Sequence, residues 1–114
     1  MPHSELRYSS DLNLDAKALL REIEQIILRH DAGSGECKGR AYPADIFHHS
    51  HCLLSVSLLT KPHRDAVFTK ALLHDLEAGL RQHLAQPCFL SLGIQYSDDN
   101  YVTTAHSPSQ GINT

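Results

Sequence analysis

The sequence has little of several residue types that mark whole classes of protein. Its 114 residues include no tryptophan, one methionine and three cysteines, and only 6% are aromatic. Cys37, Cys52 and Cys88 are widely spaced and include no Cys-x-x-Cys pair, which argues against a disulfide framework and a thiolate zinc site. No apolar run approaches the roughly 20 residues that cross a bilayer, and no signal-like segment opens the chain. We therefore expect a cytoplasmic protein with reduced thiols and no membrane partner.

The chain also lacks a strong excess of either charge. Ten basic and 13 acidic residues give a net charge of −3. Without a basic excess there is no electrostatic attraction to nucleic acid, so we expect no nucleic-acid partner. The length fits one domain, which buries somewhat under roughly 70% of the surface that its unfolded chain exposes.

Two segments carry the three- and four-residue spacing of apolar residues that predicts an amphipathic helix. The first covers residues 14–30, with Asn13 as the expected N-cap and a glycine-rich loop as its stop signal. The second covers residues 63–84 and follows Pro62. It contains Gly79, which we expect to let this helix approach a sheet closely.

Alternating apolar and polar residues predict strands over residues 51–60 and 90–96. A third segment, residues 40–47, is interrupted by Pro43, so it is expected to be an edge or bulged strand. Residues 3–9 are expected to form a first strand, more from the topology that they complete than from their own pattern.

This order predicts an α/β (α+β) fold of duplicated β-α-β units, which occupy residues 2–47 and 51–97 of a single domain over residues 1–97. Crossover helices between parallel strands place both helices on one face of a four-stranded mixed sheet. The chain has nothing left to cover the other face, so we expect neighbouring subunits to cover it. Residues 98–114 are expected to form a polar C-terminal arm.

Four short motifs stand in a particular order: Met1-Pro2-His3, Ser10-Asp11, Cys37-Lys38-Gly39-Arg40 and Lys61-Pro62-His63-Arg64-Asp65. Together with the duplicated plan they resemble the tautomerase superfamily, and within it the 5-carboxymethyl-2-hydroxymuconate isomerases, over residues 2–96. The resemblance implies a homotrimer around a barrel-like core of sheets. It also implies an active site near Pro2 at a subunit boundary, and neither a metal nor an organic cofactor.

The activity that the resemblance implies is proton transfer in unsaturated 2-hydroxy and 2-keto carboxylic acids, a step in the breakdown of aromatic compounds. Pro2 would be the catalytic base once Met1 is removed. A free α-amine has a pKa of about 7.7 to 8.0, and burial beside cations lowers it, which leaves the nitrogen neutral. The alternative is that Pro2 only starts a strand behind a blocked or retained methionine.

Such a substrate carries carboxylates, so the site also needs cations. Arg40 is the first choice as a second catalytic residue, because a guanidinium binds a carboxylate bidentately and Arg40 matches one of the family's two loop arginines. Lys38 stands in place of the other, and Arg64 matches an arginine in the corresponding loop of the relatives. Both are expected to bind substrate. The alternatives are that Arg40 and Lys38 are solvated loop charges and that Arg64 is a surface residue in a first helical turn.

Ser4 and Glu5 stand where the relatives have apolar residues, which implies a more polar pocket floor. A carboxylate at Glu5 that faced the site would raise the pKa of the Pro2 amine. With Lys38, these departures leave a second function open, in which the chain is a non-catalytic oligomer that binds a small carboxylic acid.

His48, His49 and His51 leave a third function open. On a strand, His49 and His51 share a face, a spacing compatible with zinc, nickel or copper. No carboxylate or cysteine ligand is clearly placed beside them, and the relatives carry a histidine near this position without needing metal. The prediction is therefore that no metal binds.

Overall fold

The computed structural model describes residues 1–108, and residues 109–114 of the expected arm lie outside the described part. The elements follow in the order β1 (His3–Ser9), α1 (Ala16–His30), the 3₁₀ helix η1 (Ala32–Ser34), β2 (Lys38–Ala44), β3 (His51–Leu59), α2 (Ala66–His83) and β4 (Phe89–Ser97). Every predicted helix and strand is present, with ends shifted by a few residues. Within residues 1–108, no helix has the length and apolar character to span a bilayer.

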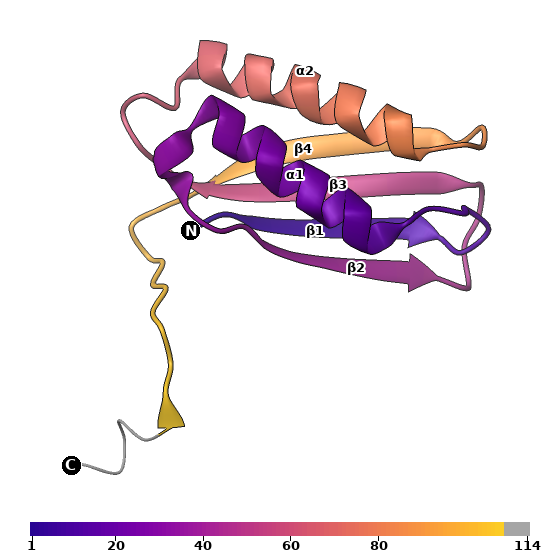
Figure 1. Ribbon diagram of the computed structural model, residues 1–114, viewed down its shortest axis with the longest axis horizontal. Coiled ribbons are helices and arrows are strands. Elements are labelled where there is room, and N and C mark those ends of the chain that lie inside the picture. The colour runs from indigo at the N-terminus through magenta and orange to yellow at the C-terminus, as the bar shows by residue number, and fades with distance from the viewer. Residues whose placement is uncertain (109–114) are drawn as a thin grey trace.

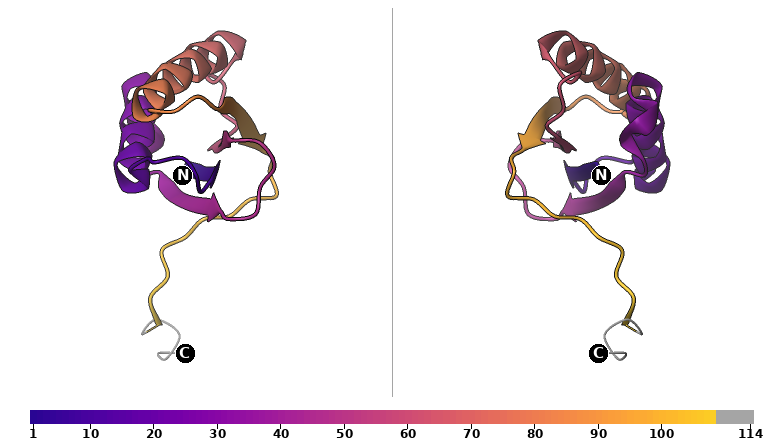
Figure 2. Two further views of the ribbon diagram at one scale, coloured as in Figure 1. Left: turned by 90° about the vertical axis from the view of Figure 1, so that its right-hand side faces the viewer. Right: turned by 90° about the vertical axis from the view of Figure 1, so that its left-hand side faces the viewer.

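The four strands form one mixed sheet in the order β2-β1-β3-β4. β1 is parallel to β2, and β3 is parallel to β4, while β1 and β3 pair antiparallel at the centre. Each parallel pair is joined by its own helix, and Figures 1 and 2 show both helices on the same side of the sheet. The predicted fold of duplicated β-α-β units is confirmed, and the strand that contains Pro43 lies at an edge, as expected.

The core lies between the helices and the sheet. Alternation along β1 and β3 decides which side chains enter it: Leu6 and Leu54 point toward the helices and are fully buried, whereas His3 and Glu5 point to the other face. The remaining core side chains that are at most 2% exposed are Leu19, Ile23, Ile26, Ile27, Cys52, Val56, Leu58, Leu72, Leu76 and Leu80.

Aspartates cap both helices. The Asp15 carboxylate accepts a hydrogen bond from the Ala18 amide at 3.1 Å, and the Asp65 carboxylate accepts one from the Phe68 amide at 2.9 Å. Each bond satisfies an amide that the first helical turn leaves without a partner. The prediction that Asn13 caps α1 was wrong, because α1 begins two residues later than the apolar spacing suggests. The Asn13 amide instead donates to the side chain of Gln86 at 2.6 Å.

The sheet face opposite the helices, here called the open face, differs between its two ends. At one end Tyr42, Arg7 and Leu53 are register partners on three adjacent strands. Tyr42 and Leu53 are 44% and 38% exposed, and Phe89 on β4 is 77% exposed. Large apolar groups that face water in this way are typical of a surface that binds protein. The other end is polar and carries the pocket described below.

Gly79 lies where the two helices cross. A Cβ atom at this position would stand 2.6 Å from Cδ1 of Ile26 on α1. The expectation that Gly79 lets α2 approach a sheet was therefore wrong, because the close neighbour is the other helix. A methyl group here would require Cδ1 of the buried Ile26 side chain to move.

We expect Gly79→Ala to lower stability by about 1–3 kcal/mol through overpacking against buried Ile26, which outweighs the roughly 1 kcal/mol gain in helix propensity. Ile26→Val removes the clashing Cδ1 atom, so in that background Gly79→Ala should become neutral or stabilising. Urea unfolding of the four proteins in this double-mutant cycle measures the coupling. An equal effect of Gly79→Ala in both backgrounds would contradict the close helix contact.

Candidate functional site

A pocket of about 320 Å³ opens on the open face, where β1 begins and β3 and β4 end. Lys38, His3, Ser57 and Gln95 are successive register partners across the four strands at this level. Antiparallel pairing of β1 with β3 thus brings the start of the chain beside the end of its last strand. The pocket is lined by His3, Arg40, Ser57, Gln95, Tyr96, Ser97 and Tyr101.

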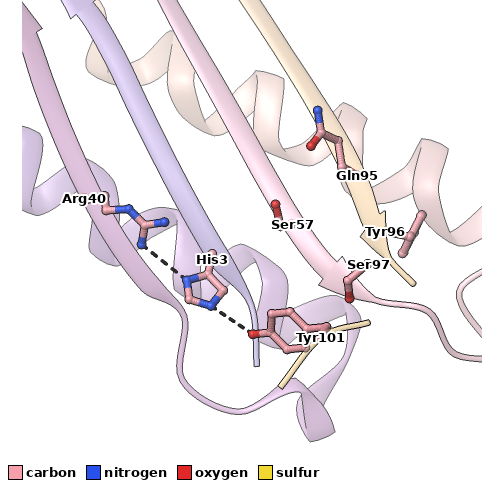
Figure 3. A pocket seen from close by; sticks show the side chains of 7 residues that line it. All are labelled: His3, Arg40, Ser57, Gln95, Tyr96, Ser97 and Tyr101. Atoms are coloured by element: carbon pink, nitrogen blue, oxygen red, sulfur yellow. Dashed lines mark hydrogen bonds between the residues drawn. The ribbon is translucent and has the colours of Figure 1, made fainter. Parts of the chain in front are cut away.

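Three of the lining residues form a hydrogen-bonded chain (Figure 3). Nη1 of Arg40 lies 3.4 Å from Nδ1 of His3, and Nε2 of His3 lies 3.0 Å from the Tyr101 hydroxyl. The Tyr101 hydroxyl also donates to the carbonyl oxygen of Met1 at 3.4 Å. Residues from both ends of the described chain therefore meet in one pocket.

The surroundings of His3 favour its neutral form, because they lower its pKa. Burial lowers its pKa most, the Arg40 guanidinium lowers it further, and the Glu5 carboxylate opposes both. Arginine has no acceptor, so the Arg40 contact requires Nδ1 of His3 to accept, and neutral imidazole then carries its hydrogen on Nε2. The directions of the two hydrogen bonds that His3 makes follow from this tautomer.

Glu5 lies on the open face, beside the pocket. Its carboxylate accepts from Arg7 at 3.0 Å and lies 3.5 Å from Nη2 of Arg40. One carboxylate thus shares its charge between two guanidinium groups that both stand on the open face. Ser4 is fully buried on the helix side, so the expectation that it forms a polar pocket floor was wrong.

Pro2 precedes His3 in the chain but is not among the residues that line the pocket, and its side chain is less than 2% exposed. Its carbonyl accepts from the Lys38 amide at 2.9 Å, which fixes the residue against β2. The amine one residue earlier, on Met1, has a pKa lowered first by burial, then by Arg64 and Lys61. An amine in this region is thereby shifted toward its neutral form.

The structure brings Arg40 into the pocket but leaves Lys38 and Arg64 outside it. Nζ of Lys38 pairs with Glu36 at 2.7 Å in a solvent-exposed contact. The Arg64 side chain is 3% exposed and donates to Asp31 at 2.8 Å and to the Leu59 carbonyl at 2.8 Å. Arg64 is therefore not the surface residue of the alternative interpretation. The Arg64 and His63 contacts lower the pKa of the Asp31 carboxyl, with His63 the larger cause.

The histidine cluster is not arranged around an ion. The ring centroids of His48 and His49 lie 4.0 Å apart with the ring planes tilted by 47°, and His49 has a positive φ of 65°. Nδ1 of His51 lies 2.8 Å from the His49 carbonyl oxygen, so this ring binds backbone. Within residues 1–108, no three histidine, cysteine, aspartate or glutamate side chains are placed to hold a metal.

Sequence reasoning missed most of the pocket. His3 could have been found, because alternation along the first strand places it on the same face as Glu5 and opposite Leu6. Ser57 and Gln95 alternate with core residues in the same way. Tyr101 lies in an irregular segment without periodicity, so no pattern in the sequence indicates its position beside His3.

No protein-family model matches the sequence, and no curated protein matches it. Solved structures do match. A 5-carboxymethyl-2-hydroxymuconate delta-isomerase superposes with a TM-score of 0.70 at 19% identity, over 100% of this chain and 93% of the other. The 5-carboxymethyl-2-hydroxymuconate isomerase from Deinococcus radiodurans R1 gives 0.72 at 21% identity, over 93% and 90%. The chain has the tautomerase fold.

A fused 4-OT protein, described as a symmetric trimer, has the same fold with a TM-score of 0.63 at 16% identity, over 96% of this chain and 98% of that one. The resemblance drawn from four short motifs is thus confirmed as a likeness of fold. At these identities the likeness shows the fold alone.

The contacts of His3 predict opposite responses to two substitutions. Arg40→Gln removes a cation that lowers the His3 pKa and should raise that pKa, whereas Glu5→Gln removes an anion that raises it and should lower it further. NMR titration of the His3 ring measures both, with Lys70→Gln on exposed α2 surface as a control that leaves the value unchanged. Shifts in the same direction for both variants would contradict the arrangement.

Proposed function

We propose that the chain is a cofactor-independent isomerase that moves a proton in unsaturated 2-hydroxy and 2-keto carboxylic acids. The model for this activity is the 5-carboxymethyl-2-hydroxymuconate isomerases of aromatic compound degradation. The observation that carries the proposal is the pocket itself, in which a guanidinium, an imidazole and several hydroxyls surround a cavity. The imidazole belongs to His3, the residue that follows Pro2. The shared fold supports it, because two of the matching structures are isomerases of this name.

Pro2 is the proposed base, after removal of Met1. Burial, Arg64 and Lys61 lower the pKa of the amine that now precedes Pro2, and the same surroundings would act on the Pro2 amine. The neutral nitrogen takes the proton of the substrate's 2-hydroxyl, the electron pairs of the conjugated system shift, and the ammonium returns the proton to carbon. The enol becomes a 2-keto acid without any other reactant.

Arg40 is the proposed partner of a substrate carboxylate, and it is half-exposed at the pocket wall. A substrate carboxylate would bind the N–H donors of this guanidinium, whose contact with the Glu5 carboxylate is long, at 3.5 Å. Lys38 is proposed to bind a second carboxylate at the pocket rim, where only an exposed contact with Glu36 competes. Because the Arg64 guanidinium is buried on Asp31, its proposed part is electrostatic, through the charge that it holds near the amine.

A non-catalytic protein that binds a small carboxylic acid is the second candidate. The observation that favours it is the Glu5 carboxylate, which pairs with Arg7 and Arg40 and weakens the positive field of the pocket. Both candidates require Arg40 to bind a carboxylate. Only the isomerase requires a free amine at Pro2, so the two are separated by substitution of that residue.

We expect Pro2→Ala to lower kcat/KM for ketonisation of 2-hydroxymuconate or of enol-phenylpyruvate by about 10²–10⁴-fold, the usual contribution of a positioned base. Intact mass of the purified protein establishes whether Met1 is absent. Equal rates for Pro2→Ala and wild type would exclude the isomerase and favour the binding protein.

The pH dependence of kcat/KM is a second test of the amine as base. Because the neutral amine is the base, kcat/KM should fall as pH drops through a pKa that lies below the ordinary value of an α-amine. Lys61→Gln removes one of the cations that lower this pKa and should move the falling limb to higher pH. Lys70→Gln, on α2, should leave the limb in place.

The open face supports a homotrimer, as in the fused 4-OT protein. We propose that neighbouring subunits cover Tyr42, Leu53 and Phe89, which are exposed in the single chain. Light scattering at micromolar concentration should then give three times the mass of one chain. Phe89→Glu places a charge on this surface and should shift the protein toward monomer, whereas Val67→Glu, on the solvent side of α2, should not. A monomeric wild type would refute the trimer.

A further inference from the structure

Tyr101 brings a hydroxyl into the pocket from beyond the end of β4. It is 98 positions from His3 in sequence, yet its hydroxyl lies 3.0 Å from Nε2 of His3. The two rings meet edge to face, with centroids 6.3 Å apart. Figure 3 shows the ring at the mouth of the pocket, below the ends of β3 and β4. This contact fixes the position of the hydroxyl relative to the first residues of the chain.

The hydrogen bonds around Tyr101 run in one direction. The Arg40 guanidinium donates to Nδ1 of His3, because arginine cannot accept. Nε2 of His3 therefore carries the hydrogen and donates to the Tyr101 oxygen. The hydroxyl hydrogen of Tyr101 is left to point at the Met1 carbonyl oxygen, 3.4 Å away. Donors arranged in series polarise one another, which makes the last hydroxyl a stronger donor.

The acceptor at the end of this series of hydrogen bonds is the Met1 carbonyl oxygen. The Met1 carbonyl is a trigonal carbon with one oxygen, bonded directly to the nitrogen of Pro2. When Met1 is absent, a substrate whose C–O group approaches the Pro2 amine enters the same neighbourhood. The Met1 carbonyl oxygen thus stands in for the oxygen of a 2-hydroxy or 2-keto acid.

We propose that Tyr101 is a catalytic residue that donates a hydrogen bond to the substrate's 2-oxygen, an inference that rests on the proposed function. While Pro2 takes the proton from that oxygen, negative charge develops there, and a preorganised donor stabilises it. Tyr101 keeps its own proton throughout, so the proton balance between Pro2 and substrate is unchanged. His3 is a positioning residue, which orients the phenol and passes on the polarisation from Arg40.

The other tyrosine at the pocket does not fill this role. The hydroxyl of Tyr96 is hydrogen-bonded to Oγ1 of Thr69 on α2, toward the helix side of the sheet. Its ring packs against the core, so it contributes to the pocket wall and not to the donor chain. Among the tyrosines of residues 1–108, Tyr101 is the one whose hydroxyl is hydrogen-bonded both to His3 and to the carbonyl oxygen of Met1, the residue before Pro2.

Tyr101→Phe keeps the ring and removes only the hydroxyl. We expect kcat for ketonisation of 2-hydroxymuconate and enol-phenylpyruvate to fall about 10²–10³-fold, as for loss of one oxyanion donor, with little change in KM. Tyr8→Phe is the matched control, because Tyr8 lies at the opposite end of β1 from His3 and its ring packs against the core. It should retain wild-type kcat. Thermal unfolding of both variants confirms that the fold is intact.

Two substitutions at His3 test positioning against a merely structural role. His3→Leu removes the donor to Tyr101 and should lower kcat roughly 5- to 10-fold, the value of one hydrogen bond. His3→Gln supplies an amide donor in its place and should recover part of the loss. Equal kcat for the two His3 variants would overturn the positioning role.

The outcomes distinguish this inference from the function on which it rests. If Pro2→Ala is inactive and Tyr101→Phe retains wild-type kcat, the Tyr101 assignment is overturned and the isomerase stands. If Pro2→Ala is as active as wild type, or wild type turns over neither enol, both are overturned. Loss of kcat in Tyr101→Phe and in Pro2→Ala, with Tyr8→Phe unaffected, supports the assignment.

Discussion

The antiparallel pairing of β1 with β3 is the constraint on which both fold and pocket depend. It joins two parallel β-α-β units into one sheet and aligns buried Leu6 with Leu54 at the centre of the core. The same register sets His3 opposite Ser57, beside the ends of β3 and β4. A shift of one residue would turn His3 toward the helices and expose the core face of β1 to water. Core and pocket are therefore fixed by a single register.

The second determinant is the distribution of a few charges. Asp31 holds the Arg64 guanidinium in a largely buried pair, which secures the segment between β3 and α2 against the end of α1. Breaking such a pair by removing one partner leaves an uncompensated charge in the interior, so the position of Arg64 is strongly defined. On the open face, Glu5 distributes one negative charge between Arg7 and Arg40. The surroundings of Met1 are therefore cationic, whereas those of Arg40 are partly neutralised.

The elements themselves could be predicted because their residues repeat with a regular period. The two-residue alternation from His51 to Leu59 coincides with a strand that has one buried face, and the helical spacing coincides with the buried side of α1. The cap at Asp15 is a local bond to an amide three residues on, and it was missed because Asn13, which is also a good cap residue, stands just before it. The contact of Gly79 with Ile26 was not predicted, because it depends on where α1 lies. The meeting of His3 with Tyr101 depends on the whole topology, and the same holds for the burial of Arg64.

A pocket made from residues near both ends of the described chain has a practical consequence for labelling. Anything attached before Pro2 keeps its nitrogen in an amide bond, and shortening the chain before Tyr101 removes a wall of the cavity. The connection between β2 and β3, residues 45–50, lies at the opposite end of the sheet from the start of the chain (Figure 1). Ile46 within it is 97% exposed. A fluorophore or inserted epitope in this loop leaves the walls of the pocket unchanged, whereas one at either end does not.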